Sequence, residues 1–100
     1  MLFLSGQVGV DPDSGRLIGE DAGVQTRQTL ANLSSVLAAA GASWSDVVSM
    51  RVYLIEQTDY AAMNQVYDQT MQQPYPARTT IYCGLNPGIR VEIDAVAVLP

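Results

Sequence analysis

The amino-acid sequence predicts an α+β fold in which a mixed β-sheet carries two helices on one face. Along the 100 residues, the period of the apolar positions changes from β-like to helical and back, twice. The expected order is two strands' worth of β-structure, then helix, strand, helix, strand, strand, and its middle part is typical of crossover connections. Right-handed crossovers place both helices on the same face of the sheet.

The opening stretch, MLFLSGQVGV, is apolar and rich in β-forming residues. Gly6 and Gly9 interrupt it, so we expect a strand with a bend or bulge. The stretch DPDSGRLIG follows, and its Asp, Pro and Gly residues predict a hairpin or a wide loop.

Residues 21–40 predict the first amphipathic helix. Gly41 follows as a stop signal. The residues expected to face the core recur at steps of four and three: Thr26, Leu30, Leu33, Leu37 and Ala40.

Residues 47–55, VVSMRVYLI, come after the turn ASWSD and predict an interior strand, because they are apolar and rich in β-branched side chains. A second helix is expected from Thr58 or Asp59, either of which can cap it. The prolines of QQPYP end that helix. Its expected buried stripe is Tyr60, Met63, Tyr67 and Met71.

Two further strands are expected in ARTTIYCG and IRVEIDAVAVL, joined through the turn sequence LNPG. In the last strand, alternate residues separate into two faces. Val91, Ile93, Ala95 and Ala97 form an apolar face, and Glu92, Asp94, Val96 and Val98 form a mixed one. A partly apolar second face indicates an interface between subunits.

Composition narrows the function classes. The length and the 48% hydrophobic content predict one domain over residues 1–100. Ten acidic residues oppose five arginines, with no lysine and no histidine, so nucleic acid is a poor partner and histidine chemistry is excluded. A single cysteine, no signal-peptide pattern and no long apolar run predict a cytoplasmic protein without a membrane span.

Arg78 is the first candidate for chemistry. It follows Pro76 at the head of a predicted strand, so its side chain leaves a rigid backbone. A rigidly placed guanidinium suits a planar carboxylate, which it grips with two parallel hydrogen bonds. The alternative is a structural ion pair with one of the ten acids.

Glu92 is the second candidate, because a carboxylate within an apolar strand is costly unless it is paired or used. It can orient water or carry protons, or it can point to solvent or neutralise an arginine. If the last two strands formed a tight hairpin, Arg78 and Glu92 would lie roughly 13 Å apart along the strand. Either another strand separates them or they meet across a subunit boundary.

Three other positions carry weaker signals. Gly6, in SGQ, either lets backbone N–H groups approach a ligand or marks a bulge. Asn64 lies off the main stripe of the second helix and is otherwise a solvated residue. Cys83 has no basic neighbour in sequence, so packing is the favoured interpretation.

Taken together, FLSGQVGVDPDSGRLIGED, QTRQTLANLSSVLAAAGASWSDVV, DYAAMNQVY, PYPART and VEIDAVAV resemble the RidA/YjgF family in order and spacing. The resemblance covers almost the whole chain. It implies a chorismate-mutase-like fold, assembled as a homotrimer with clefts between subunits. It also implies hydrolysis of 2-imino and 2-enamino acids, such as 2-aminoacrylate and 2-iminobutyrate, to 2-oxo acids and ammonia, without metal or organic cofactor.

The same resemblance implies roles for five residues. Arg78 matches the arginine that binds the substrate carboxylate, and Glu92 the acid that holds or activates water. Gly6, Asn64 and Thr80 match positions that line the cleft, with cysteine in place of Thr80 in some members. The family also has a strand before MLFLSGQ, with an aromatic residue that closes the cleft, and this chain is expected to lack it.

Two other functions fit the same residues. One is a non-catalytic trimeric module that binds small carboxylate metabolites or a protein partner. The other is a different lyase or hydrolase that keeps Arg78 as the anchor and changes the groups around Glu92.

Overall fold

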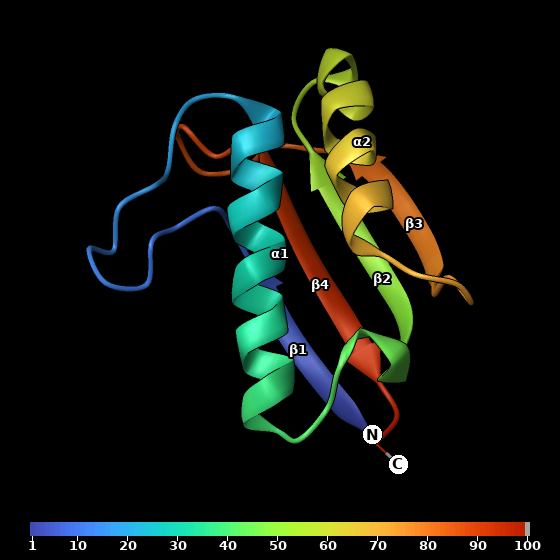
Figure 1. Ribbon diagram of the computed structural model, residues 1–100. Helices are drawn as coiled ribbons and strands as arrows, with labels where there is room; N and C mark the ends of the chain where they lie inside the picture. Colours follow the sequence, from blue (N-terminus) through green and yellow to red (C-terminus); the bar gives the residue numbers. More distant parts are fainter. Residues whose placement is uncertain (100) are drawn as a thin grey trace.

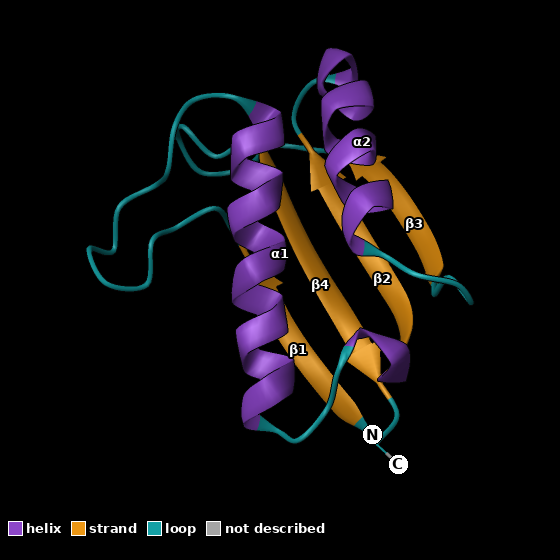
Figure 2. Ribbon diagram, in the orientation of Figure 1, coloured by secondary structure: helices purple, strands orange, loops and turns teal. Residues whose placement is uncertain are grey.

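The computed structural model describes residues 1–99, as a four-stranded sheet with both helices on one face (Figures 1 and 2). The strands lie in the order β1, β4, β2, β3. Only the β2–β3 pair is parallel. The α+β prediction is confirmed. The bounds are β1 Leu2–Gln7, α1 Ala22–Ala39, β2 Val47–Leu54, α2 Tyr60–Thr70, β3 Ala77–Tyr82 and β4 Val91–Ala97, with short 3-10 turns at Trp44–Asp46 and Gln57–Asp59.

The first helix begins and ends at the signals in its sequence. The Asp21 carboxylate accepts hydrogen bonds from the backbone N–H groups of Gly23, at 2.7 Å, and Val24, at 3.1 Å. At the other end Gly41 takes a φ of 76°, which favours glycine. The expected stripe is buried except for Ala40, which is exposed because it is the C-terminal cap of the helix.

The core lies between the helices and the sheet. Every second residue of β4, from Val91 to Ala97, is buried, and the alternation predicted for this strand is confirmed. The fully buried side chains of the other elements include Leu33, Leu37, Met50, Val52, Leu54 and Met63. Burial of apolar surface of this kind is the main favourable term in folding.

The second helix differs from its prediction at Asp59 and Tyr60, the two residues at its start. Tyr60 was expected in the buried stripe but is 37% exposed, because its ring lies beside Arg78 rather than in the core. Asp59 is the N-terminal cap by position, yet its side chain makes no capping hydrogen bond and pairs with Arg90 instead.

The last two strands are not neighbours. β2 lies between β3 and β4, so the segment LNPG connects non-adjacent strands instead of closing a hairpin. At the N-terminus, the expected bulge in β1 falls between Leu4 and Gln7. In the loop after β1, Val10 and Leu17 pair in an isolated antiparallel β-bridge. The loop projects from the side of the molecule (Figure 1). Neither helix described within residues 1–99 has the length and apolar character needed to cross a bilayer.

Candidate functional site

The guanidinium of Arg78 is held by side chains of α2. Its Nη1 donates to Asn64 Oδ1 and its Nη2 to the Tyr60 hydroxyl, both at 2.7 Å. Because Arg78 is on β3, these bonds join the edge of the sheet to the helix above it (Figure 1). Two of the five N–H groups of the guanidinium are used, so three remain without a partner within residues 1–99.

The ring of Tyr67 supports the same guanidinium from one side. The Cζ atom of Arg78 lies 4.6 Å from the centre of this ring and 5.7 Å from that of Tyr60. These distances are typical of cation–π contacts. Tyr67 is buried, and its hydroxyl donates to Met50 Sδ at 3.4 Å. Burial raises the pKa of the Tyr67 phenol, so it stays neutral beneath the cation.

A pocket of about 460 Å³ opens beside this arginine. Two tyrosines and a proline form half of its lining, and the other half is polar or charged. The lining residues are Asn64, Tyr67, Asp68, Tyr75, Pro76 and Arg78. A guanidinium with unused donors at the wall of such a pocket can bind a carboxylate through two parallel hydrogen bonds.

Glu92 and Gly6 form a second group of candidates, on β4 and β1. A Cβ atom added at Gly6 would lie 2.5 Å from Glu92 Oε2 and 3.0 Å from Glu92 Cδ. Any larger residue at position 6 would therefore collide with the carboxyl group of Glu92 where it now stands. The glycine lies in the irregular part of β1, between the paired residues Leu4 and Gln7.

A polar cluster lies next to Glu92 on the same face of the sheet. Arg51 Nε is 3.0 Å from Asp94 Oδ1, and the Tyr53 hydroxyl donates to Asp94 Oδ2 at 2.9 Å. Tyr53 is the partner of Glu92 in the β2–β4 ladder. The hydrogen bond to Asp94 raises the pKa of Tyr53, because ionising the phenol would remove the donated proton.

Arg78 and Glu92 do not meet within one chain. Arg78 points toward α2, whereas Glu92 lies between the buried Val91 and Ile93 and therefore points away from the helices. β2 also separates their strands. A site that uses both residues needs the arginine of one chain and the glutamate of another.

The remaining candidates take different positions. Thr80 is on β3, level with the buried Val52, and its Oγ1 is buried without a hydrogen-bond partner. Cys83 is partly buried just beyond β3. Within residues 1–99, no three His, Cys, Asp or Glu side chains gather in a way that could hold a metal ion.

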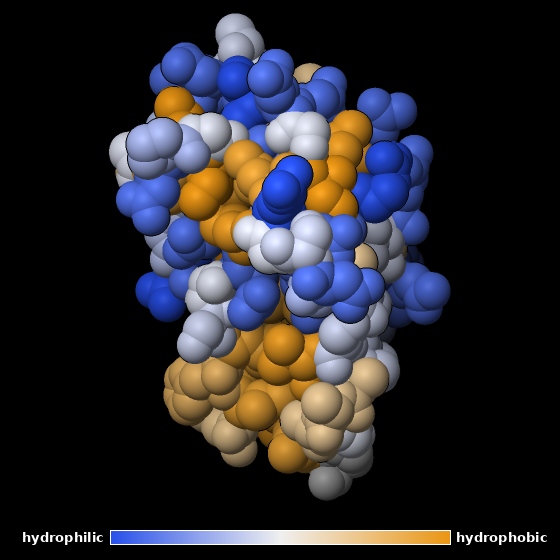
Figure 3. All heavy atoms as spheres, turned by 90° about the vertical axis from the view of Figure 1, so that its left-hand side faces the viewer, coloured by the Kyte–Doolittle hydropathy of each residue, from blue (hydrophilic) through white to orange (hydrophobic). Residues whose placement is uncertain are grey.

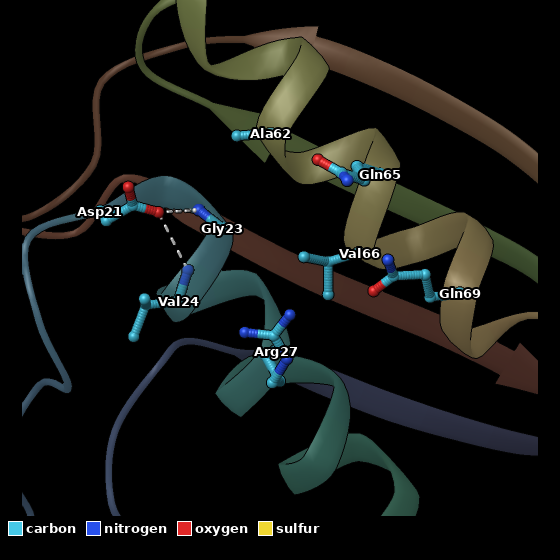
Figure 4. Close-up of a pocket in the computed structure, with 8 residues that line it drawn as sticks. All are labelled: Asp21, Gly23, Val24, Arg27, Ala62, Gln65, Val66 and Gln69. Atoms are coloured by element: carbon cyan, nitrogen blue, oxygen red, sulfur yellow. Dashed lines mark hydrogen bonds between the residues drawn. The ribbon is translucent and has the colours of Figure 1, made fainter.

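A separate groove of about 370 Å³ lies between the two helices (Figure 4). Arg27 of α1 points into it, opposite Gln65 and Gln69 of α2. The Arg27 guanidinium has no ion-pair partner within residues 1–99. This groove contains none of the candidate residues and provides a control arginine for experiments on Arg78.

Sequence reasoning missed the support that Tyr60 and Tyr67 give to Arg78. The signal was present, because residues 60, 64 and 67 lie on one side of a helix. It also missed Gln25, which is fully buried and receives the backbone N–H of Arg90 at 2.8 Å. Nothing local in the sequence distinguishes this glutamine from a solvated one.

Comparisons with known proteins agree with this architecture. The family model described as Endoribonuclease L-PSP matches residues 1–99. A 2-iminobutanoate/2-iminopropanoate deaminase of Capra hircus is 40% identical over 97% of this chain and 72% of the relative. A RutC family protein of Pyrococcus horikoshii is 39% identical over 96% of this chain and 77% of the relative.

Solved structures give the same result. RidA from an Antarctic Psychrobacter superposes with a TM-score of 0.92 at 35% identity, covering 97% of this chain and 79% of that one. Escherichia coli TdcF, solved with bound serine, gives a TM-score of 0.91 at 34% identity, covering 98% and 80%. The fold is the chorismate-mutase-like one of these proteins. The chain belongs to the RidA/YjgF family.

Proposed function

We propose that this chain hydrolyses 2-imino and 2-enamino acids to 2-oxo acids and ammonia, in clefts between the subunits of a homotrimer. The observation that carries the proposal is the Arg78 guanidinium, fixed by Asn64 and Tyr60 with three N–H groups left over at the wall of a pocket. Relatives about 40% identical are named 2-iminobutanoate/2-iminopropanoate deaminases, which supports the reaction class.

The division of the candidate residues between two faces supports a site shared by two chains. Arg78 faces α2, and Glu92 with Gly6 faces the open side of the sheet. In a closed ring of three subunits, each boundary can bring the arginine face of one subunit to the glutamate face of the next. One subunit then contributes its arginine to one cleft and its glutamate to another.

The open face of the sheet has the apolar side chains that such an assembly needs. Phe3 is 73% exposed and lies level with Val96, and Ile81 of β3 is 43% exposed. Figure 3 views the edge of the molecule at α1 and β1 rather than the open face, and at this edge apolar atoms gather over the end of the molecule near both termini. Exposed apolar side chains in contiguous groups mark association surfaces.

In the proposed reaction, Arg78 binds the carboxylate of the substrate and fixes the position of its C2 atom. Glu92 of a neighbouring subunit orients a water molecule, whose oxygen attacks C2 of the protonated imine. Glu92 takes one proton from the attacking water and passes it to the nitrogen of the tetrahedral intermediate. The C–N bond then breaks with its electron pair going to the nitrogen, and the hydroxyl proton passes through Glu92 to the departing ammonia. One water and one iminium acid become one 2-oxo acid and one ammonium ion, and an enamine first takes a proton from solvent at C3 to give the iminium acid.

This chemistry needs orientation more than strong activation, because an iminium carbon is already electrophilic. Holding water and substrate in a reactive geometry accelerates such a step without a strong base. Cleavage of RNA is not proposed for this chain. Its net charge is −5 and it has no lysine or histidine with which to neutralise phosphates or transfer protons.

The test generates 2-aminoacrylate in situ from serine with a dehydratase and measures release of the 2-oxo acid. We expect the wild type to accelerate release, Arg78→Ala to abolish the acceleration, and Arg27→Ala to behave as wild type. Arg27 is a matched control because it lies in the groove between the helices (Figure 4). A well-folded wild type that gives no acceleration would refute the deaminase proposal and favour a module that only binds carboxylates.

A further inference from the structure

Asp59 and Arg90 form a two-pronged ion pair that none of the proposed chemistry uses. Arg90 Nε lies 2.9 Å from Asp59 Oδ2, and Arg90 Nη2 lies 3.3 Å from Asp59 Oδ1. Asp59 is only 9% exposed. Its carboxylate raises the pKa of Arg90 through this hydrogen bond and its charge. Asp59 makes no capping hydrogen bond to α2, so both oxygens of its carboxylate bond to Arg90.

The pair joins the two segments that carry the candidate residues. Asp59 directly precedes Tyr60, whose hydroxyl accepts a hydrogen bond from Arg78. Arg90 directly precedes β4 and stands two residues before Glu92. A shift of the first turn of α2 would therefore move a group that holds the Arg78 guanidinium.

The Arg90 end of the pair is itself fixed. The backbone N–H of Arg90 donates to Gln25 Oε1 at 2.8 Å. Gln25 Nε2 donates to the carbonyl oxygens of Gly88, at 3.0 Å, and Gly19, at 3.1 Å. Gln25 is fully buried, and buried side chains bonded in this way have little freedom. The start of β4 is thus a firm support against which α2 is held.

We propose that Asp59 and Arg90 are positioning residues for the carboxylate site, holding the start of α2 so that Tyr60 and Asn64 present the Arg78 guanidinium in its binding orientation. The inference rests on the proposed function. It assigns to the pair an effect on substrate binding that passes through Arg78. Each subunit contributes Arg78 to one cleft and Glu92 to another. Because the pair joins the segment before Glu92 to the helix that holds Arg78, it also connects these two parts of each chain.

The experiment compares Asp59→Asn and Arg90→Lys with the wild type and with Asp13→Asn, a control in the exposed loop after β1. Asparagine keeps the shape of aspartate without its charge, and lysine keeps the charge without the planar fork. Calorimetry gives the Kd of 2-oxobutanoate, and turnover of the in situ imine gives KM and kcat. Circular dichroism and the oligomeric mass check that each variant is folded.

We expect Asp59→Asn to weaken 2-oxobutanoate binding and raise KM by about tenfold, the scale of one charge-assisted hydrogen bond, with kcat within about threefold of wild type. Arg90→Lys should lose less, and Asp13→Asn nothing. In an Arg78→Ala background, Asp59→Asn should cause no further loss of binding, because its effect passes through Arg78. A purely structural pair would lower Tm and leave Kd and KM unchanged.

The outcomes separate this inference from the proposed function. A wild type that turns over imine, with folded Asp59→Asn and Arg90→Lys variants that bind 2-oxobutanoate as the wild type does, overturns the positioning role alone. Equal losses from Asp59→Asn with and without Arg78 also overturn it. A wild type that neither binds 2-oxobutanoate nor accelerates imine hydrolysis overturns the proposed function, and the inference with it.

Discussion

Replacing Gly6 by alanine tests the role of the Glu92 carboxylate without changing any charged group. The new Cβ would lie 2.5 Å from Glu92 Oε2 and 3.0 Å from Cδ. Ordinary contacts begin near 3.5 Å, so the carboxyl group must move by roughly 1 Å. A displacement of that size in a catalytic group costs on the order of 10²-fold in rate.

The same change should leave the fold intact. Gly6 does not have a positive φ, so alanine can adopt its backbone conformation. The obstructing atoms are the far end of a flexible side chain, which can rotate away. Alanine also restricts the unfolded chain, which stabilises a protein by about 0.4–1 kcal/mol and offsets the cost of the rotation. We expect the free energy of unfolding to change by less than about 1 kcal/mol.

The assay measures kcat for imine hydrolysis and urea denaturation for Gly6→Ala, Glu92→Gln and the double variant. Gly84→Ala is the matched control, because a Cβ there meets no atom within 4 Å. We expect Gly6→Ala to lose about 10²-fold in kcat, and the double variant to be no worse than Glu92→Gln alone. A stable Gly6→Ala protein with wild-type kcat would refute the assignment of Glu92 to the reaction.

Three other changes probe stability and the interior of the site. Gly9→Ala should lower the free energy of unfolding, measured by urea denaturation, by about 2 kcal/mol or more. The new Cβ would lie 2.9 Å from the backbone of Gln25, which cannot rotate away. Wild-type stability would contradict this packing. Thr80→Val should leave stability equal or higher and activity unchanged, because Oγ1 is buried without a partner; a marked loss of either would show that the hydroxyl is used. Burial raises the pKa of the Tyr67 phenol above its ordinary 10.0. The buried neutral phenol therefore contributes stability that is present below about pH 10 and is lost as the pH rises through the folded-state pKa. Tyr67→Phe should show a shallower alkaline decline in the free energy of unfolding, and an unchanged slope would contradict this.

Much of the fold could be predicted because its signals are local. The first helix has a regular apolar stripe, which is buried except for Ala40, and a terminal glycine that acts as expected. The last strand alternates so regularly that its buried face, Val91 to Ala97, follows from the period alone. The order of the strands could not be predicted in this way. It depends on β2 pairing with both β3 and β4, and such non-local pairing leaves no signature in a short stretch.

In the candidate site too, residues with a local sequence signal were predicted and contacts between distant segments were not. Arg78 was found because proline and β-forming neighbours predict a rigid side chain, and Asn64 was named through the family resemblance. The contacts of Tyr60 and Tyr67 with Arg78 were missed, because they form only after the crossover from β2 through α2 to β3. Either Thr58 or Asp59 was expected to cap the second helix, and Asp59 takes that position without a capping hydrogen bond. Its carboxylate turned instead to Arg90, 31 positions along the chain, which no local rule indicates.

The central claim, that the site is shared between subunits, is tested most directly by mixing two inactive variants. Arg78→Ala and Glu92→Gln chains, distinguished by affinity tags, are expressed together, and the mixed trimers are isolated and assayed for imine hydrolysis. If one cleft takes Arg78 from one subunit and Glu92 from the next, each mixed trimer has both native residues in one of its three clefts, so about a third of wild-type activity should return. If the mixed trimers are as inactive as each variant alone, the shared site is contradicted.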